Sequence, residues 1–76
     1  MGTTVLDAKG LLCPLPVLKA RRALKGLKQG DTLEILATDK GAVKDFEAFC
    51  RTTGHQLVEW HDEDGVFRFV IRVLTG

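Results

Sequence analysis

The chain has 76 residues, the size of one small domain, and residues 1–76 are expected to form a single unit whose core buries only about 60% of the surface of the unfolded chain. Its composition, 45% hydrophobic and 28% charged, argues against intrinsic disorder and predicts a globular domain. Two cysteines, no signal sequence and no apolar run near the roughly 20 residues that cross a bilayer argue against a secreted or membrane protein, so we expect a cytoplasmic one.

Positive charge is concentrated near the start of the chain. Between Ala8 and Lys28 there are six basic residues and no acid: Lys9, Lys19, Arg21, Arg22, Lys25 and Lys28. Outside this segment five basic residues stand against ten acids, although the formal net charge of the chain is only +1. A basic face on an otherwise mildly acidic body indicates an acidic partner surface or a nucleic acid.

The first predicted elements are a strand and a basic amphipathic helix. A short strand at Thr3–Asp7 is followed by a loop through Gly10, and the helix is predicted to begin at Cys13 and Pro14. One face of this helix carries Val17, Ala20, Leu24 and Leu27, and the basic residues point elsewhere. The segment therefore predicts a helix that packs with one side and shows a basic exterior.

A second strand and helix follow. Thr32–Thr38 alternates apolar and polar residues, which predicts a strand with one buried face. Asp39 is a suitable N-cap for a helix from about Lys40 to Thr53, and Gly54 supplies a left-handed stop. The apolar stripe of this helix consists of Val43, Phe46, Phe49 and Cys50, so we expect Cys50 to be a core residue.

The chain closes with two strands. Gln56–Asp62 predicts a third strand, and Asp64-Gly65 is typical of a two-residue hairpin turn into a fourth strand at Val66–Leu74. The fourth strand is apolar on one side and half polar on the other, which places it near the middle of a sheet with one covered face. The order β-α-β-α-β-β predicts an α+β fold, with two helices on one face of a four-stranded mixed sheet.

Cys13 has an unusual position between an apolar loop and two prolines. If Cys13 is the N-cap, Pro14 and Pro16 fall at N1 and N3, where the missing amide proton breaks no helical hydrogen bond. The amide of Leu15 is then the helix donor left to face the sulfur. The prolines therefore fix the helix start and place an accessible thiol at its positive end.

This position predicts an activated thiol. A helix N-terminus stabilises an anion by about 0.3 to 1 kcal/mol when exposed and up to ~2 kcal/mol when partly buried. We therefore expect a lowered pKa for the Cys13 thiol, with between about a tenth and a half of it ionised at neutral pH. Three leucines (Leu11, Leu12 and Leu15) oppose this by desolvation, and two lysines (Lys9 and Lys19) favour it.

Other chemistries of Cys13 have less support in the sequence. The position three residues after Cys13 is Pro16, so a thioredoxin-like resolving cysteine is missing. A buried, inert Cys13 is the structural alternative. His55 and His61 fall on or beside the third strand, where surface or packing roles are expected, and a Cys-His hydrolase would need them to reach Cys13. Cys13, Cys50, His55 and His61 lack zinc-site spacing, so no metal site and no cofactor are predicted.

The residues resemble the TusA-like, or SirA-like, family of sulfurtransferases and sulfur carriers. The resemblance covers the chain from Val5 to Val73. It is carried by Leu6-Asp7, Gly10, the Cys-Pro-x-Pro box of Cys13, Pro14 and Pro16, Gly30-Asp31, Asp39, Phe49-Cys50 and the closing strand at 67–72. In this family Leu12 often corresponds to a polar residue, Leu15 to glutamate and Lys40 to proline, so the sequence departs from the usual pattern there.

The resemblance implies a two-layer sandwich with strand order 1-2-4-3. It also implies that Cys13 accepts sulfane sulfur as a persulfide from a cysteine desulfurase or rhodanese and hands it to an acceptor protein. Members of the family serve tRNA thiolation, sulfur oxidation, and molybdenum-cofactor or selenium metabolism. A thiol without a neighbouring cysteine suits this chemistry, since nothing within the chain would discharge the persulfide.

The basic helix leaves other functions open. Lys19, Arg21, Arg22, Lys25 and Lys28 form either a docking face for acidic partner proteins or an ordinary solvated exterior. A regulatory or redox-sensing module that binds a partner through this helix is the alternative function. Direct nucleic-acid binding is the weaker hypothesis, because the domain is not strongly basic. We expect a monomer that works with a sulfur donor and an acceptor.

Overall fold

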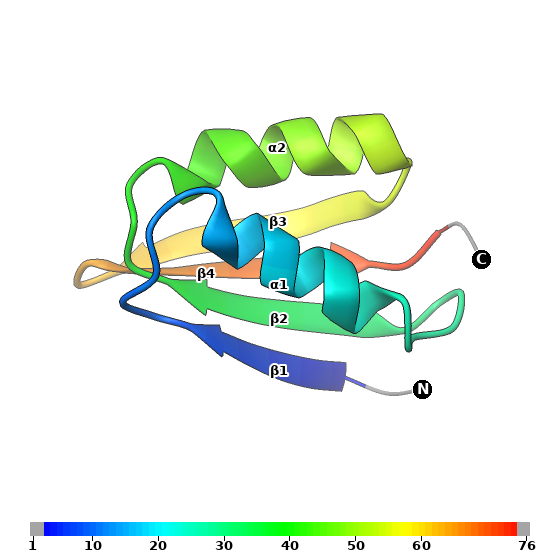
Figure 1. The fold of residues 1–76 in the computed structure, drawn as a ribbon. Coiled ribbons are helices and arrows are strands. Elements are labelled where there is room, and N and C mark those ends of the chain that lie inside the picture. The colour runs from blue at the N-terminus through cyan, green and yellow to red at the C-terminus, as the bar shows by residue number, and fades with distance from the viewer. Residues whose placement is uncertain (1–2, 75–76) are drawn as a thin grey trace.

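Two helices lie side by side on one face of a four-stranded sheet (Figure 1). The computed structural model describes residues 3–74. Its elements in chain order are β1 (Thr3–Ala8), α1 (Leu15–Leu24), β2 (Thr32–Ala37), α2 (Ala42–Thr53), β3 (Gln56–Glu63) and β4 (Val66–Arg72). The predicted α+β class and the element order are confirmed.

The sheet has the order β1-β2-β4-β3, as the family resemblance implied. β1 and β2 are parallel, and β4 pairs antiparallel with both β2 and β3, so it lies inside the sheet as its residue pattern predicted. The hairpin between β3 and β4 turns at Asp64 and Gly65, whose φ angles of 53° and 87° are both positive. Two positive φ angles are typical of the tight turn that Asp-Gly favours.

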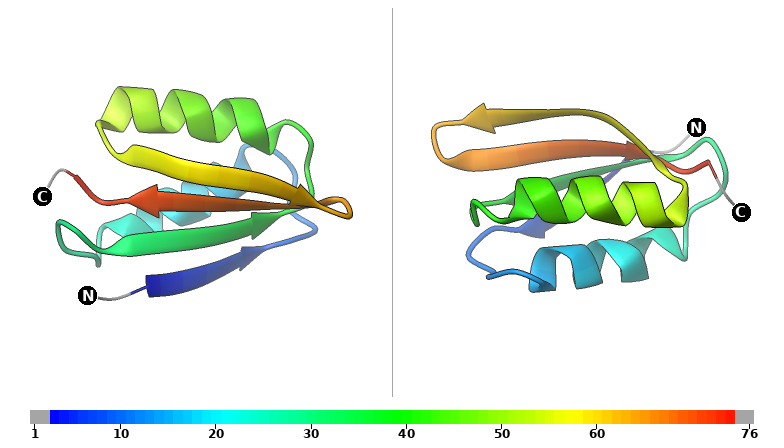
Figure 2. Two further views of the ribbon diagram at one scale, coloured as in Figure 1. Left: turned by 180° about the vertical axis from the view of Figure 1, so that it is seen from behind. Right: turned by 90° about the horizontal axis from the view of Figure 1, so that it is seen from above.

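The core lies between the helices and the sheet. α1 covers β1 and β2, and α2 covers β3 and β4 (Figure 2). The fully buried side chains of the two central strands include Leu33, Ile35, Ala37, Phe69 and Ile71. Phe46 of α2 is also fully buried, and its ring centroid lies 4.6 Å from that of Phe69. Cys50 is buried beside them, which confirms its predicted core position.

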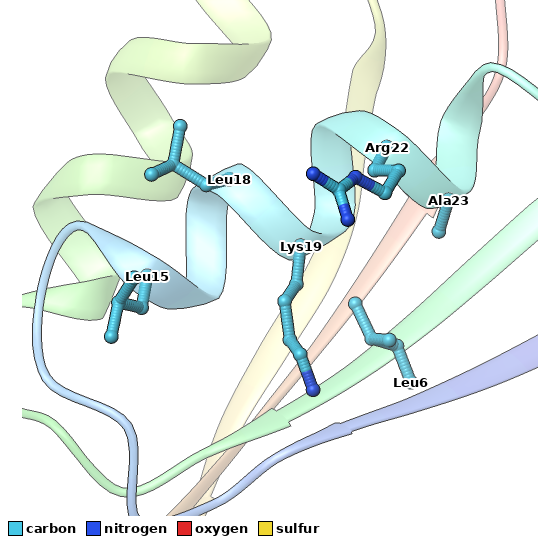
Figure 3. Close-up of a pocket in the computed structure, with 6 residues that line it drawn as sticks. All are labelled: Leu6, Leu15, Leu18, Lys19, Arg22 and Ala23. Atoms are coloured by element: carbon cyan, nitrogen blue, oxygen red, sulfur yellow. The ribbon is translucent and has the colours of Figure 1, made fainter.

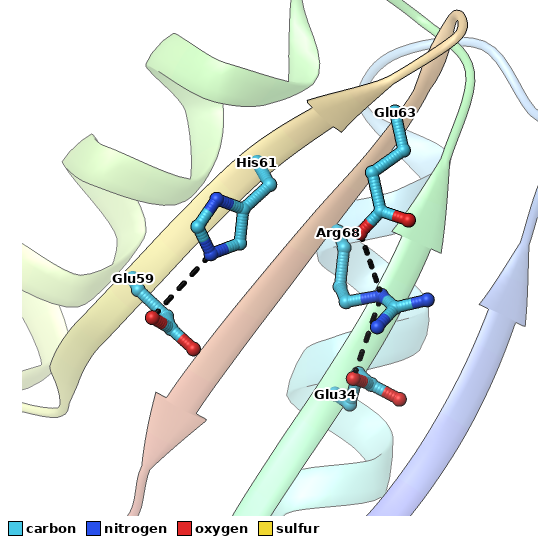
Figure 4. Close-up of polar contacts among 5 residues, drawn as sticks. All are labelled: Glu34, Glu59, His61, Glu63 and Arg68. Carbon is cyan, nitrogen blue, oxygen red and sulfur yellow. Dashed lines mark ion pairs between the residues drawn. The ribbon is translucent and has the colours of Figure 1, made fainter.

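Within residues 3–74, no helix covers the opposite face of the sheet (Figure 2). It carries charged side chains from three strands (Figure 4). Arg68 of β4 lies 3.6 Å from carboxylate oxygens of both Glu34 and Glu63, and His61 lies 3.4 Å from Glu59. This arrangement explains why β4 is apolar on one side and half polar on the other.

Both helices begin later than the sequence predicted. α1 begins at Leu15, and Pro14, with φ −100° and ψ 18°, occupies the cap position that was predicted for Cys13. The chain makes a turn first, in which the Leu15 amide donates to the Leu12 carbonyl at 2.9 Å. The first helical hydrogen bond runs from the Leu18 amide to the Pro14 carbonyl at 3.1 Å. Cys13 therefore belongs to the turn that leads into the helix.

The start of α2 is displaced for a similar reason. Asp39 was predicted as its N-cap, but the helix begins at Ala42 and Gly41 precedes it. The Ala42 amide donates to the Asp39 carbonyl at 3.0 Å, so residues 39–42 form a turn in front of the helix. At the other end Gly54, with φ 84°, stops the helix as predicted.

Candidate functional site

Cys13 lies at the edge of the sheet where β1 and β2 end. Because these two strands are parallel, the loops that follow them, residues 9–14 and 38–41, lie side by side and lead to the first turns of α1 and α2 (Figure 1). Cys13 is a free cysteine, and it is exposed, so the alternative of a buried, inert residue is wrong. The topology thus presents a reactive group at the edge where both helices begin.

Backbone-to-side-chain hydrogen bonds join the two loops. The Gly10 amide donates to Thr38 Oγ1 at 2.9 Å, and the Cys13 amide donates to Asp39 Oδ2 at 2.5 Å. Gly10 has a φ of 82°, a conformation that glycine adopts without strain. The position of the Cys13 backbone is therefore fixed by the loop after β2, more than 20 residues away in the sequence.

The two prolines after Cys13 occupy other positions than predicted. Pro14 is exposed in the turn, with a cis peptide bond between Cys13 and Pro14, and Pro16 is buried in the first turn of α1. Leu15 was predicted to offer its amide to the sulfur. That prediction is wrong, because the Leu12 carbonyl accepts this amide.

The partner of the sulfur is Asp45, in the first turn of α2. Cys13 Sγ donates a hydrogen bond to Asp45 Oδ2. This hydrogen bond raises the pKa of the Cys13 thiol, and partial desolvation and the negative charges of Asp45 and Asp39 raise it further. The predicted lowering of the pKa is therefore wrong: the Asp45 carboxylate at the sulfur and the charge of the nearby Asp39 favour the protonated thiol.

Asp39 has the opposite environment. Its carboxylate accepts the amides of Cys13 and Gly41, the second at 3.1 Å, and these hydrogen bonds lower the pKa of Asp39. An ionised Asp39 is thus bound into the loop, where it holds Cys13 in place. Asp39 positions the backbone of the cysteine, whereas Asp45 contacts its sulfur.

The sequence reasoning missed the relation of both aspartates to Cys13. They lie 26 and 32 residues from Cys13, so no local spacing indicates a contact. The available signal was topological, because the β-α-β order predicts that the loops after β1 and β2 meet at the same edge. Asp39 lies in the second of these loops, and Asp45 follows in the first turn of the next helix.

Three exposed leucines lie within five residues of the cysteine in the sequence. Leu12, Leu15 and Leu18 are 72%, 47% and 50% exposed, high values for large apolar side chains. Leu15 and Leu18 line a groove of about 450 Å³ together with Leu6, Lys19, Arg22 and Ala23 (Figure 3). We call this feature the leucine groove. It lies between the outer side of α1 and β1.

The basic residues of α1 do not form one face. Lys19 and Arg22 lie along the leucine groove. Arg21 lies on the side toward α2, in a second groove that also contains Pro14 and Asp45. Lys25 lies further along, in a groove with His55 near the C-terminal ends of the two helices. The predicted docking residues are therefore divided between two sides of the helix.

Residues 3–74 contain neither a candidate metal cluster nor a candidate membrane-spanning helix. No group of three or more His, Cys, Asp or Glu side chains there is placed to hold a metal ion. No helix in this range is long and apolar enough to cross a membrane.

The sequence matches the family described as sulfurtransferase TusA over residues 4–73. The chain belongs to the TusA family. It is 54% identical to a protein of Neisseria meningitidis named as a sulfur carrier protein, over 95% of this chain and 97% of that one. It is 49% identical to the sulfur carrier protein TusA of Allochromatium vinosum, over 88% of each chain.

The fold of the TusA family member agrees with a solved structure. The crystal structure of a SirA-like protein from Desulfitobacterium hafniense has a TM-score of 0.82 and 28% sequence identity, and the match covers 99% of this chain and 100% of that one. The resemblance inferred from the Cys-Pro-x-Pro box is confirmed. A sulfur-relay role is the function that the names of the relatives support.

Proposed function

We propose that this protein is a sulfur carrier in which Cys13 accepts sulfane sulfur as a persulfide from a donor protein and passes it to an acceptor protein. The observation that carries this proposal is the position of Cys13, a free and exposed thiol at the edge where both helices begin. The donor would be a cysteine desulfurase or a rhodanese. The protein would thus act as a sulfurtransferase without a bound cofactor.

The second cysteine supports a carrier rather than an internal redox pair. Cys50 is buried in the core, and burial raises the pKa of its thiol to about 11. A buried, protonated thiol is a poor nucleophile, so it would not attack a persulfide at the surface. The sulfur would stay on Cys13 until an acceptor protein arrives.

The surroundings of Cys13 suit protein partners. The leucine groove, which includes Leu15, two residues after Cys13 in the sequence, offers apolar contact area, and Lys19 and Arg22 would pair with acidic residues on the partner. Arg21 and Lys25 would contact a partner that covers the other side of α1. Leu12 and Leu15 stand where family members often have polar residues, so they are the first candidates for residues that select the partner.

We place this relay in a reducing cytoplasm, where free thiols persist. It would feed a process such as tRNA thiolation or another branch of sulfur metabolism. The carrier would deliver sulfur to an acceptor protein and would not need to touch the RNA. Gly10, Pro14 and Pro16 would serve the function by shaping the loop that carries Cys13.

Mass spectrometry tests the proposal directly. Incubation with a cysteine desulfurase and cysteine is expected to add one sulfur atom to the intact protein, located at Cys13 by peptide mapping. Cys13→Ser is expected to gain none, and Cys50→Ala, the matched control, is expected to load like the parent. Sulfur found at Cys50 would contradict the proposal. Full cellular function of a Cys13→Ala variant would favour the regulatory alternative instead.

A further inference from the structure

The contact between Cys13 and Asp45 is more specific than a carrier thiol requires. Cys13 is exposed, and water alone would satisfy its sulfur. Instead Asp45, which lies 32 residues later in the chain, accepts a hydrogen bond from Sγ through its Oδ2. The neighbouring loop adds a second carboxylate, Asp39, whose Oδ2 binds the Cys13 amide. The thiol thus has a negative environment on the side of α2.

The proton of this hydrogen bond belongs to the sulfur. Carboxylates are far weaker bases than thiolates, with ordinary pKa values of about 3.9 and about 8.5. Asp45 therefore acts as an acceptor that stabilises the thiol and opposes the thiolate. The charged groups around the sulfur are Asp45 of α2, Asp39 of the 38–41 loop and, in the groove beside Asp45, Arg21 of α1.

We propose that Asp45 guards the empty carrier: its hydrogen bond keeps Cys13 as a thiol of low reactivity, and sulfur loading requires that this bond be broken. The inference rests on the proposed function of Cys13. A docked donor would break the bond by placing a cationic side chain or a hydrogen-bond donor against Asp45. Small electrophiles and oxidants bring no such group, so they would meet a protonated and unreactive sulfur.

The loading step balances without an outside oxidant or reductant. Sγ loses its proton and attacks the terminal sulfur of the donor persulfide. The sulfur–sulfur bond of the donor breaks, a new one forms at Cys13, and the departing donor thiolate takes up the proton released by Cys13. Afterwards Sγ has no proton to donate to Asp45. The carboxylate then faces a persulfide that is partly anionic, and their repulsion favours an outward position of the terminal sulfur, toward an acceptor.

Removal of the charge at Asp45 tests whether its hydrogen bond keeps Cys13 unreactive. Asp45→Asn keeps the size of the side chain, and Glu47→Gln, an exposed position on the same helix, makes the same change of charge away from the sulfur. We expect Asp45→Asn to react with iodoacetamide about three- to tenfold faster than the parent at pH 7, because one pKa unit changes the thiolate fraction tenfold. Its pH profile should move to lower pH. Glu47→Gln should match the parent.

The rate of sulfur loading distinguishes a protective role of Asp45 from a role as general base. With glutathione persulfide as donor, Asp45→Asn is expected to gain sulfur faster than the parent. Slower loading would show that Asp45 accepts the proton of Cys13 during the reaction, and it would overturn the proposal. An unchanged rate and pH profile would overturn it as well. If the parent itself gained no sulfur at Cys13 from a desulfurase, the proposed function would fail, whatever the result for Asp45.

Two controls show whether a faster reaction of the variant comes from the loss of the Asp45 charge or from a change in fold. Circular dichroism and the thermal midpoint of Asp45→Asn should match those of the parent, and Cys50 should stay unreactive in both proteins because it is buried. If the asparagine variant does not fold, Asp45→Ser removes the same charge with a smaller side chain and should give the same acceleration. A folded serine variant that reacts no faster than the parent would overturn the proposal.

Discussion

At Asp39 one carboxylate fixes both loops of the site. Its Oδ2 accepts the Cys13 amide, and its Oδ1 accepts the Gly41 amide in the turn that precedes α2. These amides stabilise the ionised form, which is why the pKa of Asp39 is lowered. Linkage then requires that the ionised carboxylate stabilise the folded state.

We predict that Asp39→Asn lowers the free energy of unfolding at neutral pH, and that its difference from the parent vanishes in acid. A lowered pKa stabilises the fold fully above the ordinary aspartate pKa of about 3.9, and this contribution is lost as the pH falls through the lowered value. Urea unfolding at pH 7 and at a series of values below pH 4 measures the difference. A gap that stays constant down to the lowest pH would contradict the prediction.

The reactivity of Cys13 shows where prediction from the sequence stops. The free, exposed cysteine and its prolines were visible in the Cys-Pro-x-Pro box. The direction of its pKa shift was predicted wrongly, because that direction depends on Asp45 and Asp39, which approach the sulfur only after the two loops have met. A local estimate from the helix N-terminus omits the nearest charges.

At the scale of elements, successive side chains of a strand point to opposite faces of the sheet, and this alternation determines which of them are buried in the core. In β2 the residues Leu33, Ile35 and Ala37 are fully buried under the helices, whereas Glu34 is on the uncovered face. Val5 of β1 is 58% exposed although it pairs with the same strand. Strand residues therefore contribute to stability according to their face.

This difference predicts unequal costs for small substitutions. Ile35→Val should lower the free energy of unfolding by about 0.5–1.5 kcal/mol, because it opens a small cavity in the core. Val5→Thr, the matched change on an exposed strand position, should stay within about 0.5 kcal/mol of the parent. Urea unfolding followed by the fluorescence of Trp60, the single tryptophan, reports both. Equal losses would show that the assignment of the faces is wrong.

The elements themselves were largely predictable, and their starts were not. Periodicity and the turn residues Gly54 and Asp64-Gly65 gave the order, the hairpin and the interior position of β4. The start of α1 was predicted one residue early and that of α2 two residues early, because Cys13 and Asp39 have the composition of caps but their segments first form turns. A turn and the first turn of a helix share the same preferred residues, so sequence alone separates them poorly.

At the scale of the whole molecule, the segment that carries Cys13 also carries apolar side chains that the core does not bury. Leu12, Leu15 and Leu18 lie in and just before the first half of α1, and all three are 47% exposed or more. Exposed apolar area beside a reactive group is typical of a surface that a partner covers. The leucine groove would then contribute to transfer between proteins and leave the chemistry of the thiol itself unchanged.

We predict that Leu18→Ser slows sulfur loading from a protein donor but leaves the reaction of Cys13 with iodoacetamide unchanged. Val58→Ser, which alters a 40% exposed residue of β3, serves as the control and should affect neither rate. Loading is followed by mass spectrometry at donor concentrations below saturation. An equal effect of both substitutions, or an altered alkylation rate for Leu18→Ser, would argue against a docking role for the groove.

The register of the sheet separates the thiol from the ends of the chain. Thr3, Thr32 and Arg72 share one edge of the sheet, and Ala8, Ala37 and Phe67 share the opposite edge, where Cys13 lies (Figure 1). A tether attached before β1 or after β4 would emerge on the side away from the sulfur. The carrier could thus be immobilised on a support, or fused to another domain, and the sulfur on Cys13 would stay accessible to a partner protein.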